Sequence, residues 1–205
     1  MSLPFHCQTR LDSIPADLPY LSAEPARIEH WAGVLDRRHH PATLYVGLVW
    51  KGNPRFENDA DRSLPDISVL AELGKIADIR FISLQKGAGE DEAANPPASL
   101  PLLNLGPQVT DFADMAAIVA NLDLVIAVDT AVAHLTGALG KPCWLLLPDY
   151  QTDWRWLTGR VDSPWYPQVM RLFRQPQPGN WQAVVDQLDI ALRQRVSGAG
   201  DVETA

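Results

Sequence analysis

The sequence of 205 residues lacks any long apolar run and has only two cysteines, Cys7 and Cys143. A membrane-spanning helix needs about 20 consecutive apolar residues, so we expect no membrane span. Two cysteines so far apart in the chain argue against a disulfide framework or a metal cluster. The first residues show no basic segment followed by an apolar one, unlike a secretory signal. The sequence therefore predicts a cytoplasmic protein with neither a metal ion nor a cofactor.

An excess of positive charge is also lacking, because the formal net charge is −8. The basic residues form no long stripe, which argues against a nucleic-acid partner. The pattern Gly-x-Gly-x-x-Gly and the phosphate-binding P-loop pattern are missing, so hydride transfer and ATP hydrolysis are disfavoured. No Ser-His-Asp or Cys-His set is recognisable. An anionic ligand would have to be held by a local group of donors.

What the sequence does contain is a regular alternation of apolar runs with helical segments. Runs such as 124–128 are apolar throughout, as in strands that helices cover on both faces. This pattern predicts an α/β fold, doubly wound and Rossmann-like, with a mostly parallel six-stranded sheet. The predicted strands are 43–50, 79–85, 100–105, 122–129, 142–148 and 169–174, and the predicted helices are 24–38, 65–77, 112–121, 130–139 and 181–196.

We expect one folded domain over residues 25–196. Residues 1–24 are proline-containing and show little periodicity, which is typical of an extended lead-in or linker. Residues 197–205 contain small and charged residues and are predicted to form a disordered tail. In doubly wound sheets, ligands bind beyond the carboxyl ends of the strands, where the strand order reverses. Function is therefore expected in the segments that follow the strands.

The segment after the predicted strand 122–129 gives the strongest local signal. Asp129 or Thr130 can cap the following helix, and the free amides of its first turn, beginning at Ala131, would form an anion site. His134 lies about one turn further on and could donate to a phosphate or a sugar hydroxyl. The alternative is that Asp129 and Thr130 only cap the helix and His134 only packs.

Cationic and amide side chains follow the first two predicted strands. Lys51 and Arg62 would compensate the charge of a pyrophosphate, and Gly52, next to Asn53, would let the backbone approach it closely. A charged surface loop, in which neighbouring acids pair with these cations, is the alternative. After the second strand, the pair Gln85-Lys86 could read a base or a ribose.

Five aromatic residues gather in the connections 149–156 and 163–167. So many aromatic side chains are unusual for plain loops, and they indicate a surface for a sugar or a neighbouring domain. The alternative is that they pack the loops onto the sheet.

The run from Val125 to Leu135, Val-Ile-Ala-Val-Asp-Thr-Ala-Val-Ala-His-Leu, resembles the Asp-Thr-Gly-x-x-His-Leu signature of glycosyltransferase family 9. That family holds the lipopolysaccharide heptosyltransferases. A closer likeness is to the C-terminal region of bacterial proteins that join tetratricopeptide repeats to a family-9-like domain. This second likeness includes five further segments, which are 46–54, 62–65, 83–87, 153–156 and 163–167. The likeness extends from about Ile14 to Leu192, with Ala131 in place of the signature glycine.

The resemblance implies the C-terminal, donor-binding half of a GT-B glycosyltransferase. It places the diphosphate and the sugar at Asp129, Thr130, the amide of Ala131, and His134. It also implies that Arg62 corresponds to a position where heptosyltransferases have a lysine that binds phosphate. Two further groups follow from it: Lys51, Gly52 and Asn53 near the phosphates, and Gln85 and Lys86 near the nucleoside.

The function implied by the resemblance is inverting transfer from a nucleotide-diphosphate sugar to an unknown acceptor. The catalytic base is expected outside this chain, in an N-terminal acceptor domain, and a tetratricopeptide partner is a further expectation. Two alternatives remain open. One is a non-catalytic interaction module with a vestigial nucleotide crevice, and the other is an enzyme similar to nucleotide-sugar epimerases.

Overall fold

The computed structural model describes residues 3–39 and 43–198, and six strands form its single sheet. The strands run in the order β3-β2-β1-β4-β5-β6, and all five neighbouring pairs are parallel. Their bounds are β1 Leu44–Val49, β2 Ile79–Ser83, β3 Leu102–Asn104, β4 Leu124–Val128, β5 Cys143–Leu147 and β6 Met170–Arg174. The predicted six-stranded α/β fold is confirmed, and the strand pairing is parallel throughout.

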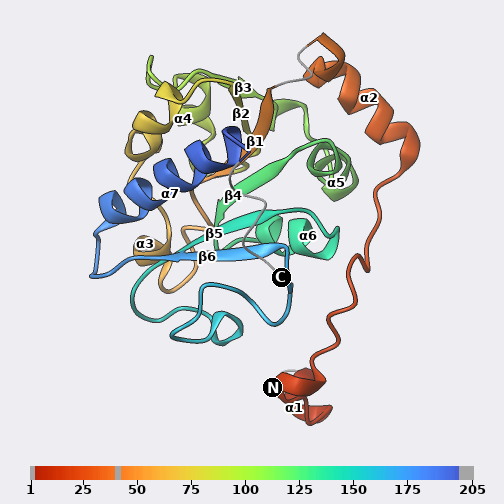
Figure 1. Ribbon diagram of the computed structural model, residues 1–205, viewed down its shortest axis with the longest axis vertical. Coiled ribbons are helices and arrows are strands. Elements are labelled where there is room, and N and C mark those ends of the chain that lie inside the picture. The colour runs from red at the N-terminus through yellow and green to blue at the C-terminus, as the bar shows by residue number, and fades with distance from the viewer. Residues whose placement is uncertain (1–2, 40–42, 199–205) are drawn as a thin grey trace.

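Helices cover both faces of the sheet, so two hydrophobic cores flank it. On β4, Val125 and Ala127 face the core formed with α2 (Pro25–Leu35), α5 (Phe112–Ala120) and α6 (Ala131–Ala138). Leu124, Ile126 and Val128 face the other core, which is covered by α7 (Trp181–Val196) and the 3-10 helix η3 (Ile67–Lys75). Figure 1 shows α7 crossing in front of the strands. Each fully buried valine, leucine or isoleucine side chain contributes roughly 1.5–3 kcal/mol of transfer free energy.

Several short elements were not predicted from the sequence. They are α1 (Leu3–His6), α3 (Asp59–Arg62), α4 (Glu90–Ala94), and the 3-10 helices η1 (Leu11–Ser13), η2 (Arg37–His39), η4 (Gly106–Gln108) and η5 (Trp154–Trp156). The predicted helix 65–77 is present as η3, in the 3-10 form. There the backbone at Gly74 passes so close to Ser99 that a Cβ would lie 1.9 Å from the Ser99 carbonyl oxygen. The predicted strand 100–105 is reduced to β3, an edge strand paired only with β2.

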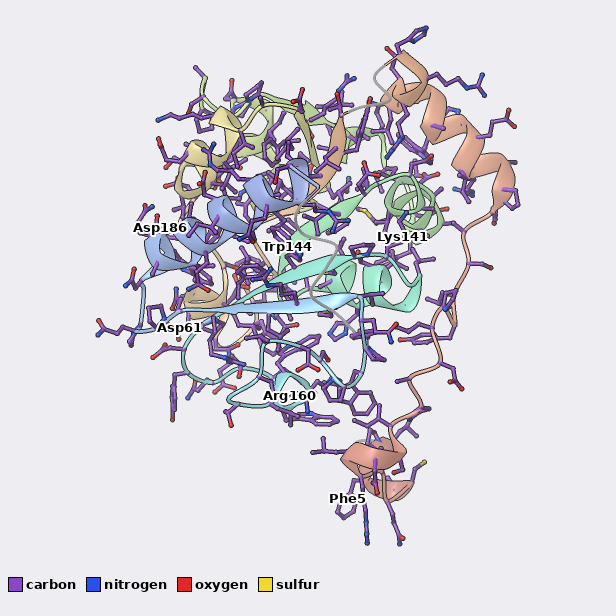
Figure 2. The ribbon with its side chains drawn as sticks, in the orientation of Figure 1. Phe5, Asp61, Lys141, Trp144, Arg160 and Asp186 are labelled. Carbon is purple, nitrogen blue, oxygen red and sulfur yellow. The ribbon has the colours of Figure 1, made fainter. Side chains whose placement is uncertain are left out.

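The lead-in is partly attached to the domain. The amides of Tyr20 and Leu21 both donate to the carbonyl of Ala138 at the end of α6. Further upstream the chain leaves the body of the molecule and ends in α1 (Figure 1), where Phe5 projects outward (Figure 2) and is 71% exposed. Within residues 3–39 and 43–198, no helix is both long and apolar enough to cross a bilayer. Of the predicted tail, residues 199–205 lie outside the described residues.

Candidate functional site

Two cavities open at the carboxyl edge of the sheet, beside the point where the strand order reverses between β1 and β4. Such a switch point is where doubly wound sheets bind ligands. The first cavity has a volume of about 580 Å³, and the second about 620 Å³. Both are lined by Arg62, Thr130 and Ala131, which therefore form a shared wall.

The amino end of α6 forms one side of this wall. Thr130 is the N-cap residue, but its side chain makes no capping hydrogen bond. Its backbone carbonyl accepts from the amides of Ala133 and His134, at 3.0 and 3.4 Å. The amides of Ala131 and Val132 belong to the first turn and have no acceptor within the helix. Because both residues line the first cavity, the helix end presents free donors and a positive dipole to a ligand.

Arg62 forms the other side of the wall, as the sequence suggested. Its Nη1 donates to the carbonyl of Asp129 at 3.0 Å, and its Nε donates to Asp59 Oδ1 at 3.0 Å. The guanidinium also lies 4.4 Å from the centre of the Phe56 ring. A Cβ on Gly52 would lie 2.5 Å from Asp59 Oδ1 and 2.6 Å from Arg62 Nη2, so a larger residue there would require this ion pair to shift. The cation is thereby fixed beside the amino end of α6.

Lys51 lines the first cavity, but its charge is already paired. Its Nζ forms an ion pair with Glu92 of α4, whose carboxylate also accepts from Trp50 Nε1 at 2.8 Å. The alternative in which acids pair with the loop cations therefore applies to both cations. Arg62 pairs with Asp59 of the same crossover at 3.0 Å, and Lys51 pairs with Glu92 of another crossover. Asn53 lines the same cavity, and its Oδ1 accepts from the amide of Arg55.

Gln85 and Lys86 line the first cavity with polar groups that bind the backbone. Gln85 is 1% exposed, and its Oε1 accepts from the amides of Trp50 and Lys51 at 2.9 and 3.0 Å. Its Nε2 donates to three carbonyl groups. Lys86 Nζ donates to the carbonyl of Gly106 at 2.9 Å. Gln85 thus joins the ends of β1 and β2, and the nucleoside contact of both residues stays a prediction.

His134 lies in a pocket of aromatic and acidic side chains. Its ring stacks on Trp156 with centroids 5.1 Å apart, and its Nδ1 lies 2.9 Å from the hydroxyl of Tyr166. Its Nε2 lies 3.7 Å from Asp129 Oδ1, while Asp129 Oδ2 accepts from Trp156 Nε1 at 2.9 Å. Burial lowers the pKa of His134, and the charge of Asp129 opposes that effect. A neutral imidazole is therefore favoured at the second cavity.

Trp156 and Tyr166 were expected only as members of the aromatic connections, and the sequence did not place them against His134. Both belong to the aromatic connections, and both are buried. Their packing agrees with the alternative in which aromatics hold the loops on the sheet. Trp154 differs, because it is 48% exposed and meets Trp165 edge to face at 5.5 Å.

The two cavities differ in chemistry. The first has an apolar wall that includes Val49, Leu84, Val109 and Met115. Most residues that line the second carry polar side chains, among them Glu57, Asn58, Asp129, Gln151, Thr152 and Asp153. Among the described residues, no group of three or more His, Cys, Asp or Glu side chains is placed to hold a metal ion. An apolar slot beside a cavity with many polar side chains, with a cation and a helix end between them, suits a ligand with three chemically distinct parts.

The central part of the chain matches a known family. Residues 69–146 match the model of glycosyltransferase family 9 (heptosyltransferase). Protein FlbA of Caulobacter vibrioides is 30% identical over 186 residues, which cover 89% of this chain and 30% of FlbA. The resemblance to family 9 expected from the sequence is confirmed, while the tetratricopeptide context stays a prediction.

Two solved structures have a similar fold. E. coli ADP-heptose lps heptosyltransferase II superposes with a TM-score of 0.59 at 17% identity, over 90% of this chain and 57% of that chain. A glycosyl transferase family 9 protein from Veillonella parvula gives a TM-score of 0.53 at 12% identity, over 85% of this chain and 45% of that chain. The chain thus spans about half the length of these structures. At these identities the likeness establishes the Rossmann-like fold.

Proposed function

We propose that this chain is the donor-binding part of a glycosyltransferase and binds a nucleotide-diphosphate sugar across the two cavities. The pyrophosphate would lie against the amino end of α6 and Arg62. The nucleoside would occupy the apolar first cavity, and the sugar the polar second cavity. The match to family 9 supports transfer as the reaction, and the inverting outcome rests on that resemblance.

The observation that carries this proposal is the shared wall. Arg62 and the first-turn amides of α6 converge on the boundary between an apolar and a polar cavity. In addition, the buried oxygens Thr130 Oγ1 and Asn58 Oδ1 have no hydrogen-bond partner within the described part of the chain. Buried polar atoms are seldom left unpaired, so these two atoms are suited to polar groups of a ligand.

The same wall accounts for departure of the leaving group. When the bond between the sugar and the diphosphate breaks, negative charge develops on the departing oxygen. Arg62 and the amides of Ala131 and Val132 are fixed donors at the place where that charge would develop. Donors that need no reorganisation stabilise such a transition state. Transfer also requires activation of the acceptor, and we assign that step to a separate domain.

The test is calorimetric titration with ADP, GDP, UDP, CDP and the corresponding nucleotide sugars. We expect at least one of them to bind in the micromolar range. We expect Arg62→Met to weaken binding on the order of 100-fold, because a charge-assisted contact of about 1.5–3 kcal/mol is lost. Arg62→Lys should lie in between, since it keeps the charge but loses the planar fork.

Arg160→Met is the matched control, because Arg160 forms an exposed ion pair with Asp162 away from both cavities. Its affinity should equal that of the wild type. Absence of binding by every nucleotide below millimolar concentration would contradict the proposal and favour an interaction module. Conversion of a nucleotide sugar in the absence of any acceptor would instead favour the epimerase alternative.

A further inference from the structure

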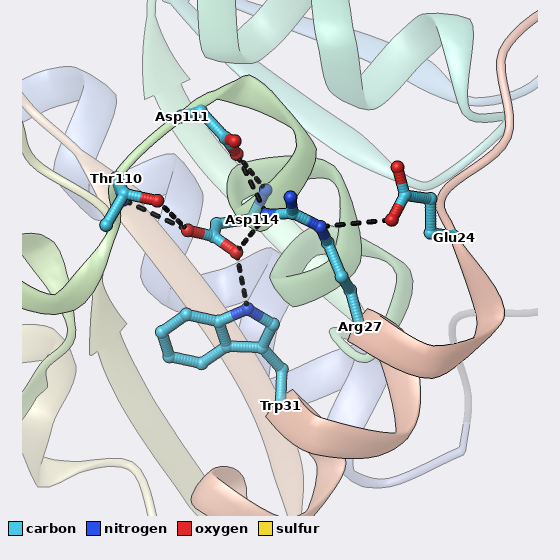
Figure 3. A network of polar contacts seen from close by, with 6 residues as sticks. All are labelled: Glu24, Arg27, Trp31, Thr110, Asp111 and Asp114. Carbon is cyan, nitrogen blue, oxygen red and sulfur yellow. Dashed lines mark hydrogen bonds and ion pairs between the residues drawn. The ribbon is translucent and has the colours of Figure 1, made fainter.

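Asp114, in the first turn of α5, connects a wall of the first cavity with helix α2. Its Oδ2 accepts from the amide and the hydroxyl of Thr110, at 3.1 and 2.5 Å, and Thr110 lines the cavity. Its Oδ1 accepts from Arg27 Nη1 at 2.6 Å and from Trp31 Nε1 at 3.4 Å, and both of these residues belong to α2. Figure 3 shows the carboxylate between Thr110 on one side and the two α2 side chains on the other.

Arg27 extends the same connection to the start of α5. Its guanidinium pairs with Asp111 at 3.2 Å as well as with Asp114, and with Glu24 at 3.1 Å. Asp111 lines the first cavity and caps α5 by accepting from the amide of Asp114 at 2.8 Å. One cation on α2 therefore holds two carboxylates on either side of the turn that forms the cavity wall (Figure 3).

The charge state of Asp114 suits this role. The hydroxyl of Thr110 is the main cause that holds the pKa of Asp114 well below its usual range, and Arg27 and Trp31 add to the effect. The carboxylate is thus ionised, and its side chain is only 14% exposed. Hydrogen bonds to an ionised, poorly exposed acceptor are stronger and more directional than those of an exposed pair.

We propose that Asp114 is a positioning residue of the nucleotide cavity. It holds residues 109–112 in the conformation that receives the nucleoside. Through Arg27, it also makes that conformation depend on the position of α2. Asp114 does not itself line the cavity and acts through Thr110 and Asp111. The role toward a nucleoside rests on the proposed function, whereas the ordering of the wall does not.

The test compares Asp114→Asn and Thr110→Val with the wild type. Binding of the preferred nucleoside diphosphate and of inorganic pyrophosphate is measured by calorimetry. We expect the nucleoside diphosphate to bind about tenfold more weakly in both variants, as for loss of one hydrogen bond to a charged group. Pyrophosphate, which would lie against the α6 end and Arg62, should bind as in the wild type. The control is Asp189→Asn, which removes an ion pair with Arg193 on α7 and should change neither affinity.

Amide hydrogen exchange of the ligand-free protein tests the wall separately. Exchange in residues 109–113 should become faster in both variants, while exchange in residues 130–134 stays unchanged. Unchanged exchange at 109–113, or an equal loss of affinity for both ligands, would overturn the positioning role. If the wild type binds no nucleotide, the proposed function fails, and the exchange data alone decide whether Asp114 orders the wall.

Discussion

His134 is a half-buried imidazole whose neighbours make protonation unfavourable in the folded state. Burial between Trp156 and Tyr166 lowers its pKa below the ordinary value of 6.5, and the nearby Asp129 only partly offsets this. The unfolded chain therefore binds a proton at this residue first as the pH falls. The stabilising contribution is present above about pH 6.5 and is lost as the pH falls through the lower pKa of the folded state.

We therefore predict that His134→Asn flattens the pH dependence of stability. The free energy of unfolding, measured by urea titration between about pH 8 and pH 5, should fall more steeply for the wild type than for the variant. Over this pH range, the difference in free energy of unfolding between wild type and variant should narrow by less than about 1 kcal/mol. The effect is small because about a third of the His134 side chain is exposed. Parallel curves for the two proteins would show that His134 titrates as it does in the unfolded chain.

At the scale of residues, the sequence identified chemical groups but not their partners. Thr130 and Arg62 lie at the predicted crevice because both follow buried parallel strands, whose carboxyl ends share one edge. Lys51 follows a strand in the same way, yet its ammonium group pairs with Glu92, which lies 41 positions further along the chain. Neither the spacing nor the composition of the sequence predicts that contact, because it depends on how two separate crossovers pack against each other.

At the scale of elements, the apolar runs were reliable guides to the central strands. β1, β4 and β5 are buried on both faces, so their sequences are apolar at almost every position. The short helices α3 and α4 and the 3-10 form of η3 were not predicted, since elements of one or two turns depend on tertiary contacts more than on local preference. These short elements nevertheless supply Arg62 and Glu92 to the site.

Helix α6 packs so tightly on the aromatic pocket that we predict a loss of stability when Gly137 is replaced by alanine. A Cβ at Gly137 would lie 2.4 Å from the ring of Tyr166, so Gly137→Ala must displace the ring that contacts His134. We expect a loss of about 1–3 kcal/mol of stability from overpacking, despite the better helix propensity of alanine. Thermal denaturation would measure the loss of stability. Titration with a nucleotide sugar should show weaker binding, because the displaced Tyr166 ring disturbs His134.

Gly33 on α2 offers the matched control. Nothing lies within 4 Å of a Cβ at that position. Gly33→Ala should therefore stabilise the protein by about 0.4–1 kcal/mol, because it only reduces the freedom of the unfolded chain. If both substitutions stabilise the protein, α6 and Tyr166 are less closely packed than the structure indicates.

At the scale of the whole molecule, the lead-in is partly attached to the folded domain. The composition of residues 1–24 suggested an extended lead-in or linker, and that boundary stays a prediction. The structure packs Leu18 and Ala23 on the core beside α2, and the backbone at Tyr20 and Leu21 is bonded to the end of α6. Composition shows where regular elements begin, but it does not show which extended residues pack against them.

These contacts predict how the protein responds to truncation. The backbone hydrogen bonds described for residues 3–13 lie within that segment, so a chain that begins at Ile14 should keep its melting temperature to within about 1 °C. A chain that begins at Ser22 loses the contacts of Leu18, Tyr20 and Leu21, and a loss of about 1–2 kcal/mol of stability would lower the melting temperature by about 2–8 °C. Because Tyr20 also contributes to raising the pKa of Tyr166, the longer truncation should perturb His134 as well. Equal melting temperatures for the two truncated chains would place the true boundary at residue 25, as the composition suggested.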